Sequence, residues 1–235
     1  MPVLLKGPTG CGKTRFIQAM AQELQRPLIT VACHEDLTAG DLVGRFLLHS
    51  SETKWQDGPL TRAVREGAIC YLDEIVEARA DTTVVIHPLA DHRRELNIER
   101  LGERLLAPAG FMLVLSYNPG YQSVLKDLKP STRQRMVAIE LSYPTPEIEV
   151  RILQNEAGID AEIADRLVRL GQAIRKLVHE GLPEVASTRA LVSTAKLFKA
   201  GLSLQEASEA SIARALTDDP IATRQLLEIV QAYVA

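Results

Sequence analysis

The stretch Gly7-Pro8-Thr9-Gly10-Cys11-Gly12-Lys13-Thr14 lies between a short apolar run, Val3-Leu4-Leu5, and a segment whose apolar residues recur at helical spacing. It satisfies the pattern G-x-x-x-x-G-K-[ST] at every constrained position, in the strand-to-helix context that a phosphate-binding loop requires. Gly10 and Gly12 can adopt the positive φ angles that turn successive N–H groups toward phosphate oxygens. The stretch therefore predicts a nucleoside triphosphate site, against the alternative of a glycine-rich turn with a chance Lys-Thr.

Two side chains of this loop have predicted roles in binding the triphosphate. Lys13 is expected to reach the β- and γ-phosphates as a mobile positive charge, and the Thr14 hydroxyl is expected to ligate Mg²⁺. The helix that follows directs its partly positive N-terminus at the same anion. The predicted nucleotide-binding residues of the loop are Gly7, Pro8, Thr9, Gly10, Cys11, Gly12, Lys13 and Thr14.

A second informative stretch is Ala68-Ile69-Cys70-Tyr71-Leu72-Asp73-Glu74, a buried apolar strand that ends in two adjacent carboxylates. Asp73 is predicted to hold Mg²⁺ through its water shell, and Glu74 to polarise the water that attacks ATP. The alternative is a strand followed by a solvated acidic turn. The phosphate-binding loop upstream favours the catalytic interpretation, because the two motifs together are typical of ATPases.

Three further polar residues lie near predicted strand ends. The apolar run Phe111–Tyr117 ends at Asn118, whose amide could bind the γ-phosphate or the attacking water, although Asn-Pro-Gly is also an ordinary turn sequence. Arg133 and Arg135 flank the start of a strand predicted over Met136–Leu141. Pairing with nearby acids is a structural role that both arginines could have.

The remaining pattern predicts an α/β domain followed by a helical domain. A strand is expected over 27–32, hairpins near 45–57 and 95–107, and helices over 59–64 and from Ala78 to near Leu89. After Pro146 only helical periodicity remains, with helices near 146–157, 160–179, 188–200, 203–216 and 220–233. We therefore expect a nucleotide-binding domain over 1–143, with a five-stranded parallel sheet, and a helical lid over 144–235.

Composition limits the classes of function. A net charge of −3 gives no general reason to expect a nucleic-acid partner, and no apolar run is long enough to span a bilayer. No signal peptide is visible and the three cysteines cannot all pair, so a reducing cytoplasm is the expected location. The histidines lack metal-ligand spacing, and we expect surface or packing roles for His34, His49, His87, His92 and His179.

The ordered set of motifs resembles the AAA+ ATPases, and among them the MoxR group, over essentially the whole chain. The resemblance implies a P-loop αβα sandwich with a five-stranded parallel sheet and a small helical lid, which binds ATP and Mg²⁺. The two predicted hairpins are similar to the helix-2 and pre-sensor-1 inserts of that group. By position, Asn118 is similar to the family's sensor 1 residue, and Arg189 of Ser187-Thr188-Arg189-Ala190 to its sensor 2 residue.

Two residues of this chain match the position of the family's arginine finger. Arg135 matches the arginine of the family's D-R-F pattern, but Gln134 and Met136 stand in place of its Asp and Phe. Arg133 therefore remains a rival for that role. The resemblance implies that one of these two arginines completes the catalytic site of a neighbouring subunit.

Longer stretches are similar to the CbbQ/NirQ/NorQ subfamily of the MoxR group, namely His34–Thr38, Asp41–Arg45, Tyr117–Ser123 and Leu125–Arg135. The resemblance implies a homo-oligomeric ring, usually a hexamer, that works with a von Willebrand factor A-domain protein. CbbQ members act with CbbO to remodel inhibited Rubisco and release tight-binding sugar phosphates, and NorQ members are needed to mature nitric oxide reductase. The motifs favour the CbbQ activity, with a CbbO-like adaptor and Rubisco as client, over nitric oxide reductase maturation.

Two other classes of function share parts of this pattern. A P-loop small-molecule kinase would use Lys13 and Thr14, but it would not account for Asp73-Glu74 and a helical C-terminal domain. A nucleotide-gated assembly module with little turnover, as in gas-vesicle relatives, would need nucleotide binding but not Glu74.

Family members usually carry a segment before the first strand that helps to enclose the adenine. Here only two residues precede that strand, so the adenine-binding residues are not identified.

Overall fold

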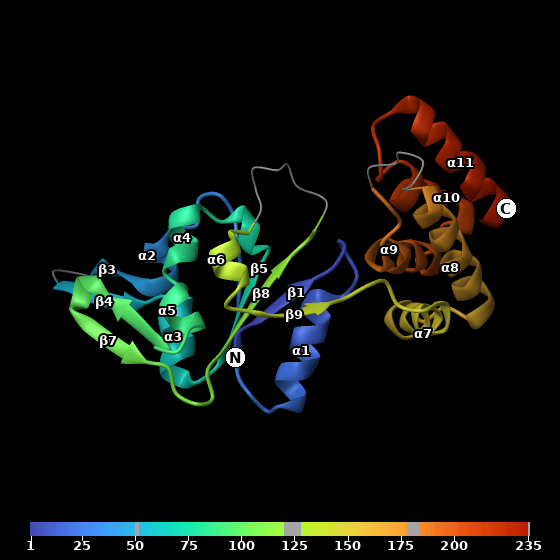
Figure 1. The fold of residues 1–235 in the computed structure, drawn as a ribbon. Helices are drawn as coiled ribbons and strands as arrows, with labels where there is room; N and C mark the ends of the chain where they lie inside the picture. The colour runs from blue at the N-terminus through green and yellow to red at the C-terminus, as the bar shows by residue number, and fades with distance from the viewer. Residues whose placement is uncertain (50–51, 120–127, 178–183, 235) are drawn as a thin grey trace. The chain divides into compact units, whose positions relative to one another are not determined.

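The structure of the chain is a computed structural model that describes residues 1–49, 52–119, 128–177 and 184–234. It divides into two compact units (Figure 1). One consists of Met1–Pro8 and Lys13–Leu141, and the other of Thr9–Gly12 and Ser142–Ala235.

The first unit is built on a five-stranded sheet, in which each pair of neighbouring strands is parallel, as predicted. The strand order is β2-β5-β8-β1-β9, and the bounds are β1 (Val3–Lys6), β2 (Leu28–Ala32), β5 (Ile69–Asp73), β8 (Met112–Tyr117) and β9 (Val137–Glu140). Because the carboxyl ends of parallel strands lie at one edge, the segments that follow β1, β5 and β8 are brought together there. These segments carry the phosphate-binding loop, the two carboxylates and Asn118.

Alternate residues of the central strands are buried on opposite faces of the sheet, which explains why β5 is apolar at nearly every position. On one face, Ile69 and Tyr71 pack with Ile17 and Ala21 of α1 (Lys13–Glu23). On the other face, side chains of the same strands pack against α3 (Pro59–Glu66), in a cluster that includes Cys70, Leu72, Leu113, Leu115, Leu60, Ala63 and Val64. The two faces fix β5 between two layers of helices (Figure 1).

One expected helix, from Ala78 to near Leu89, is wrong as a single element. The segment forms two short helices, α4 (Ala80–Val84) and α5 (His87–Ala90). Pro88 has no N–H to donate and so interrupts the i→i−4 hydrogen bonds that a continuous helix needs. The other short helices of this unit are α2 (Ala39–Val43), α6 (Pro130–Arg133) and the 3₁₀ turns Ile75–Glu77 and Glu99–Leu101.

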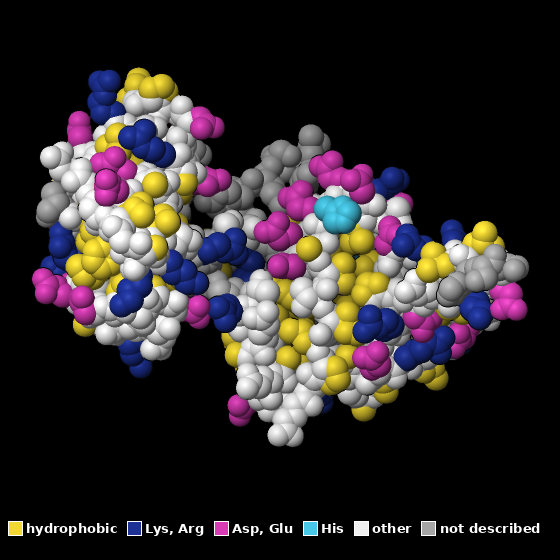
Figure 2. Space-filling model, turned by 180° about the vertical axis from the view of Figure 1, so that it is seen from behind, with side chains coloured by type: hydrophobic (Ala, Val, Ile, Leu, Met, Phe, Trp, Pro, Cys, Tyr) yellow, Lys and Arg dark blue, Asp and Glu magenta, His cyan; other side chains and the backbone are white. Residues whose placement is uncertain are grey.

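Two antiparallel hairpins lie outside the main sheet. The first pairs β3 (Gly44–His49) with β4 (Glu52–Asp57), and the second pairs β6 (Glu95–Ile98) with β7 (Glu103–Leu106). Phe46 and Leu48 of β3 are 44% and 80% exposed, and Figure 2 shows hydrophobic side chains at the surface among charged ones of both signs. The first hairpin therefore presents apolar surface to solvent.

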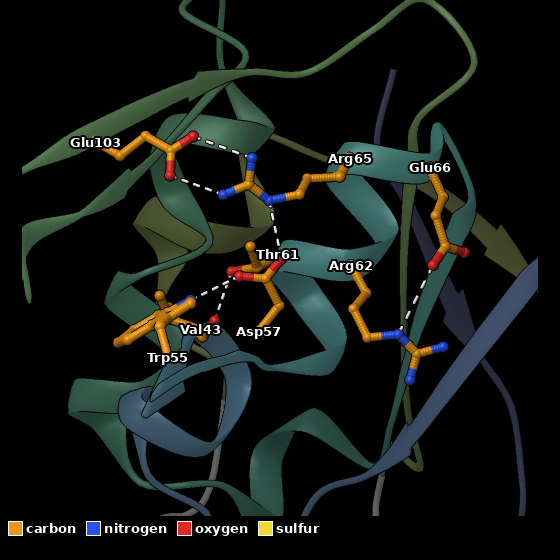
Figure 3. A network of polar contacts seen from close by, with 8 residues as sticks. All are labelled: Val43, Trp55, Asp57, Thr61, Arg62, Arg65, Glu66 and Glu103. Carbon is orange, nitrogen blue, oxygen red and sulfur yellow. Dashed lines mark hydrogen bonds and ion pairs between the residues drawn. The ribbon is translucent and has the colours of Figure 1, made fainter. Parts of the chain in front are cut away.

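Arg65 of α3 joins the two hairpins (Figure 3). Its Nε donates to Asp57 Oδ2 at 2.8 Å, at the end of the first hairpin. Its two terminal nitrogens donate to the two oxygens of Glu103, at 3.0 and 2.7 Å, at the start of β7. Trp55 Nε1 donates to the other oxygen of Asp57 at 2.6 Å. One guanidinium thus holds both hairpins against the helix that leads into β5.

Replacing Arg65 with Ala is expected to lower the free energy of unfolding by about 1–2 kcal/mol, because a fork-shaped pair shared by two carboxylates is stronger than an isolated surface pair. Arg62→Ala is the matched control, since among the described residues Arg62 pairs with Glu66 alone, on the same exposed helix face, at 3.7 Å (Figure 3). Its loss should cost less than about 0.5 kcal/mol. Urea unfolding measures both, and equal costs for the two variants would contradict this role of Arg65.

The described part of the second unit is helical, apart from its turns and connections. Its elements are α7 (Pro146–Ala157), α8 (Ala161–Lys176), α9 (Thr188–Lys199), α10 (Leu204–Ser208), a π-helical turn (Glu209–Ala213) and α11 (Pro220–Val234). Ser187 and Ser203 cap the starts of α9 and α10 with their side chains. The helix expected over 203–216 is regular α-helix only over Leu204–Ser208. After Ser208 the hydrogen bonding becomes π-helical, since Arg214 N donates to Glu209 O, five residues earlier.

Candidate nucleotide-hydrolysis site

The phosphate-binding loop leaves β1 and enters α1 with Lys13 as the first helical residue. Gly10 and Gly12 have φ angles of +70° and +101°, the left-handed region that favours glycine. Lys13 is buried, and its Nζ donates to the backbone oxygens of Gly7 and Pro8, each at 3.0 Å. The two carbonyls at the start of the loop therefore hold the lysine at its end.

Asn118 links Lys13 to Glu74. Lys13 Nζ donates to Asn118 Oδ1, and Asn118 Nδ2 donates to Glu74 Oε1 at 3.1 Å. The amide presents its oxygen to the cation and its nitrogen to the carboxylate, which uses both ends of the side chain. The structure thus brings together Lys13, Asn118 and Glu74, three residues that the sequence predicted for one site from three separate segments.

Thr14 and Asp73 place two oxygen atoms where a magnesium ion was predicted. Thr14 Oγ1 donates to Asp73 Oδ2 at 3.2 Å. A hydroxyl with a carboxylate is a donor set that Mg²⁺ accepts, and the carboxylate can act directly or through a bound water. The two residues therefore fit the predicted ion by donor type.

Sequence reasoning missed two residues of this site, Tyr71 and Ser116. Both side chains are fully buried, and both lie against the second oxygen of Asp73: Tyr71 OH donates to Asp73 Oδ1 at 2.6 Å and Ser116 Oγ donates to it at 2.5 Å. Burial, together with the hydrogen bond to Asp73, raises the pKa of Tyr71 well above its usual range, so its hydroxyl keeps its proton. The sequence did contain a signal for both residues. Each is a hydroxyl residue in an otherwise apolar strand, two positions before a predicted site residue: Tyr71 before Asp73, and Ser116 before Asn118.

Glu74 has a backbone conformation that is uncommon for a residue with a side chain. Its φ and ψ are +54° and 49°, in the left-handed region, directly after β5. Its N–H donates to Ser116 Oγ at 3.1 Å. The turn lets adjacent residues serve different partners, since Asp73 faces Thr14 while Glu74 faces Asn118.

The two candidate arginine fingers have different surroundings. Arg133, at the end of α6, lies with its guanidinium carbon 5.8 Å from the centre of the Tyr117 ring, one residue before Asn118. Arg135 donates to the Ser131 carbonyl, and its Nε lies 3.9 Å from Asp91 Oδ2.

Arg189, the predicted sensor 2 residue, is the second residue of α9 and belongs to the second unit. Part of the subfamily resemblance, over 120–127, lies outside the described residues, as does His179. Within the described ranges no three His, Cys, Asp or Glu side chains form a metal-binding group, and none of the helices is long and apolar enough to cross a membrane.

All three cysteines are free thiols. Cys11, in the phosphate-binding loop, is partly exposed, whereas Cys33 and Cys70 are buried. Burial raises the pKa of Cys70 to about 12. Burial and the charges of Asp73 and Glu74 do the same for Cys33, so both buried thiols stay neutral.

Comparison with known proteins identifies the family of the chain. Residues 2–136 match the family described as an AAA domain of the dynein-related subfamily, and residues 149–233 match the CbbQ/NirQ/NorQ C-terminal family. The chain is 60% identical to the denitrification regulatory protein NirQ of Stutzerimonas stutzeri, over 99% of this chain and 85% of that protein. It is 59% identical to NorQ of Paracoccus denitrificans (99% and 86%) and 56% identical to CbbQ of Hydrogenophilus thermoluteolus (94% and 82%).

Among solved structures, a RuvB variant of Thermotoga maritima aligns with a TM-score of 0.58 and 17% identity, over 97% of this chain and 62% of that one. At this identity the likeness shows the fold alone, and it agrees with the fold described above. The matches to both family models and the identity of 56–60% to NirQ, NorQ and CbbQ show the family. The chain belongs to the CbbQ/NirQ/NorQ family of AAA ATPases.

Proposed function

We propose that the chain is a Mg²⁺-dependent, ATP-hydrolysing motor that remodels a client enzyme in the cytoplasm. The observation that carries this proposal is the convergence of Lys13, Thr14, Asp73, Glu74 and Asn118 at one edge of the sheet. These side chains supply a phosphate-binding cation, two oxygens suited to Mg²⁺, a carboxylate and an amide that orients it.

The five residues divide the work of hydrolysis among them. Lys13 exchanges its bond to Asn118 for the β- and γ-phosphates, and Asn118 then orients Glu74 or the attacking water. Glu74 accepts the proton of that water as it attacks the γ-phosphate. Thr14 and Asp73 would hold Mg²⁺, which when bound neutralises charge on the phosphates.

The chain is proposed to form a hexameric ring. In this ring, an arginine from the neighbouring subunit completes each hydrolysis site. Arg135 is favoured as this finger, because Arg133 lies over Tyr117, next to the Asn118 of its own subunit, while Arg135 lies further along the chain beside Asp91. Arg189 of the second unit is proposed to contact the nucleotide as sensor 2. Neither role requires a metal or cofactor beyond Mg²⁺.

An arginine acting in a neighbouring subunit predicts complementation between two inactive variants. Arg135→Ala and Glu74→Gln should each lower the hydrolysis rate by about 100-fold or more, whereas mixed rings should regain a clear fraction of wild-type activity. Activity is recovered at interfaces where the Arg135→Ala subunit supplies an intact Glu74 and its Glu74→Gln neighbour supplies an intact Arg135. Repeating the mixture with Arg133→Ala identifies the finger, and absence of recovery with either arginine variant would contradict a shared site.

The client is proposed to be an enzyme of denitrification, with nitric oxide reductase first. The motifs alone favoured Rubisco, but the identities are higher to relatives named for denitrification, at 60% for two NirQ proteins, than to CbbQ, at 56%. Reactivation of inhibited Rubisco with a CbbO-like adaptor is the second candidate. In either case a von Willebrand factor A-domain protein is the proposed partner.

A parallel reconstitution tests the client. Inactive nitric oxide reductase and sugar-phosphate-inhibited Rubisco are each incubated with the chain, ATP and the corresponding von Willebrand factor A-domain partner, and recovered client activity is measured. Recovery of the reductase that needs ATP, the partner and Glu74 is expected. Recovery of Rubisco alone would move the assignment to the second candidate. Recovery that survives Glu74→Gln but not Lys13→Ala would instead favour a nucleotide-gated assembly module.

A further inference from the structure

Ser116 lies at the centre of the polar contacts behind the two carboxylates. Its Oγ donates to Asp73 Oδ1 at 2.5 Å, accepts the Glu74 N–H at 3.1 Å and lies 3.0 Å from Tyr71 OH. A serine hydroxyl has one hydrogen, which goes to Asp73, and the Glu74 N–H occupies one of its acceptor positions. The one hydrogen of Tyr71 is directed to Asp73, so the two hydroxyls are neighbours without a hydrogen bond between them. The side chain is fully buried in β8.

The contacts on Asp73 decide which of its oxygens faces Thr14. Tyr71 and Ser116 both donate to Oδ1, which leaves Oδ2 as the oxygen beside Thr14 Oγ1. Rotation of the carboxylate would break both hydroxyl contacts at once. The plane of Asp73 is therefore set from inside the sheet, before a cation is bound.

The contact on Glu74 acts on the backbone. Its N–H is held by Ser116 at the residue where the chain turns into the left-handed region. A residue with a Cβ persists there only where its surroundings hold it. That turn points the Glu74 side chain to Asn118 and away from the Asp73 position.

We propose that Ser116 and Tyr71 are positioning residues for ATP hydrolysis, in which Ser116 sets both carboxylates and Tyr71 sets Asp73. The proposal rests on the proposed function. It divides the two residues by their contacts: Tyr71 reaches the ion-binding carboxylate, whereas Ser116 reaches that carboxylate and the backbone of the proton acceptor. The two hydroxyls should therefore affect different steps.

The test compares Tyr71→Phe and Ser116→Ala with the wild-type chain. Partners that orient a metal ligand typically change metal affinity or activity by about 10–100-fold. Tyr71→Phe is expected to raise the half-saturating Mg²⁺ concentration by about 10-fold, with a smaller effect on kcat. Ser116→Ala is expected to raise it similarly and also to lower kcat by about 10–100-fold, and Ser116→Thr, which keeps the hydroxyl, should recover part of both.

A second measurement does not depend on turnover. The affinity for a fluorescent ADP analogue is measured with Mg²⁺ and with EDTA, and the ratio of the two reports how well the site holds the ion. Both variants should reduce this ratio while leaving the affinity in EDTA within about threefold of wild type. Thr82→Val is the matched control, since Thr82 is a fully buried hydroxyl of the same unit that bonds the Leu37 carbonyl.

The outcomes separate this inference from the proposed function. Wild-type Mg²⁺ dependence in both variants would overturn the positioning role, and so would equal losses in EDTA and Mg²⁺, because those indicate a merely structural role. A wild-type chain that binds Mg²⁺–ADP but does not hydrolyse ATP would contradict the proposed function alone. The ratio measurement would still decide whether Tyr71 and Ser116 orient the carboxylate.

Discussion

Lys13→Ala is expected to weaken ATP binding by about 100-fold or more and to abolish measurable hydrolysis. Hydrogen bonds to charged groups contribute about 1.5–3 kcal/mol each, and Lys13 is positioned to make more than one to the phosphates. The buried Nζ already lies at the centre of the loop, bonded to the carbonyls of Gly7 and Pro8. A smaller side chain also leaves those carbonyls without their donor.

Binding of a fluorescent ATP analogue measures the first effect and phosphate release the second. Lys54→Ala is the control for a lost positive charge, because Lys54 is exposed on β4 and forms a local ion pair with Glu52 at 3.4 Å. A thermal melt excludes unfolding of the Lys13 variant as the cause. ATP affinity within threefold of wild type in Lys13→Ala would show that the triphosphate binds elsewhere.

The largest expected effect on stability is at Glu149, in the second unit. Its carboxylate is completely buried, and Arg175 binds it with two nitrogens, at 2.9 and 2.6 Å. Thr188 Oγ1 donates to the same carboxylate at 2.6 Å, and Arg175 Nε donates to the Ala186 carbonyl at 2.8 Å. These contacts join α7, α8 and the start of α9 through one buried charge.

Arg175→Ala is expected to lower the free energy of unfolding of the second unit by about 3–5 kcal/mol, because it leaves the Glu149 carboxylate buried without its counter-ion. Arg169→Ala on the same helix is the control, since its pair with Asp165 at 2.8 Å is exposed to solvent. That variant should change stability by less than about 1 kcal/mol. Unfolding in guanidinium chloride measures the free energy of unfolding of both variants. A similar loss of stability for the two would contradict a buried ionic centre.

Much of the fold and the main site residues could be predicted because their signals are local. The loop from Gly7 to Thr14 and the strand that ends in Asp73-Glu74 combine a spacing with an apolar period that one segment contains in full. The five-stranded sheet, the AAA fold and ATPase membership are confirmed by the structure and the comparisons. The catalytic roles of the individual residues stay predictions.

What could not be predicted depends on contacts between distant segments. Ser116 lies 43 positions from Asp73 in the chain, and only the parallel pairing of β5 with β8 places it there. Arg65 is separated by 38 positions from Glu103, so neither sequence segment indicates that they pair. The choice between Arg133 and Arg135 depends on the neighbouring subunit of the proposed ring, which no local pattern in the sequence describes.

The most direct test of ATP hydrolysis at this site is phosphate release per bound ATP, measured for the wild-type chain and for Glu74→Gln. Loss of a general base typically lowers a rate by about 100- to 10,000-fold. If Glu74 activates the attacking water, the variant will bind ATP with an affinity within about threefold of wild type and release phosphate at least about 100-fold more slowly. Glu74→Gln that releases phosphate at the wild-type rate would contradict the site as described.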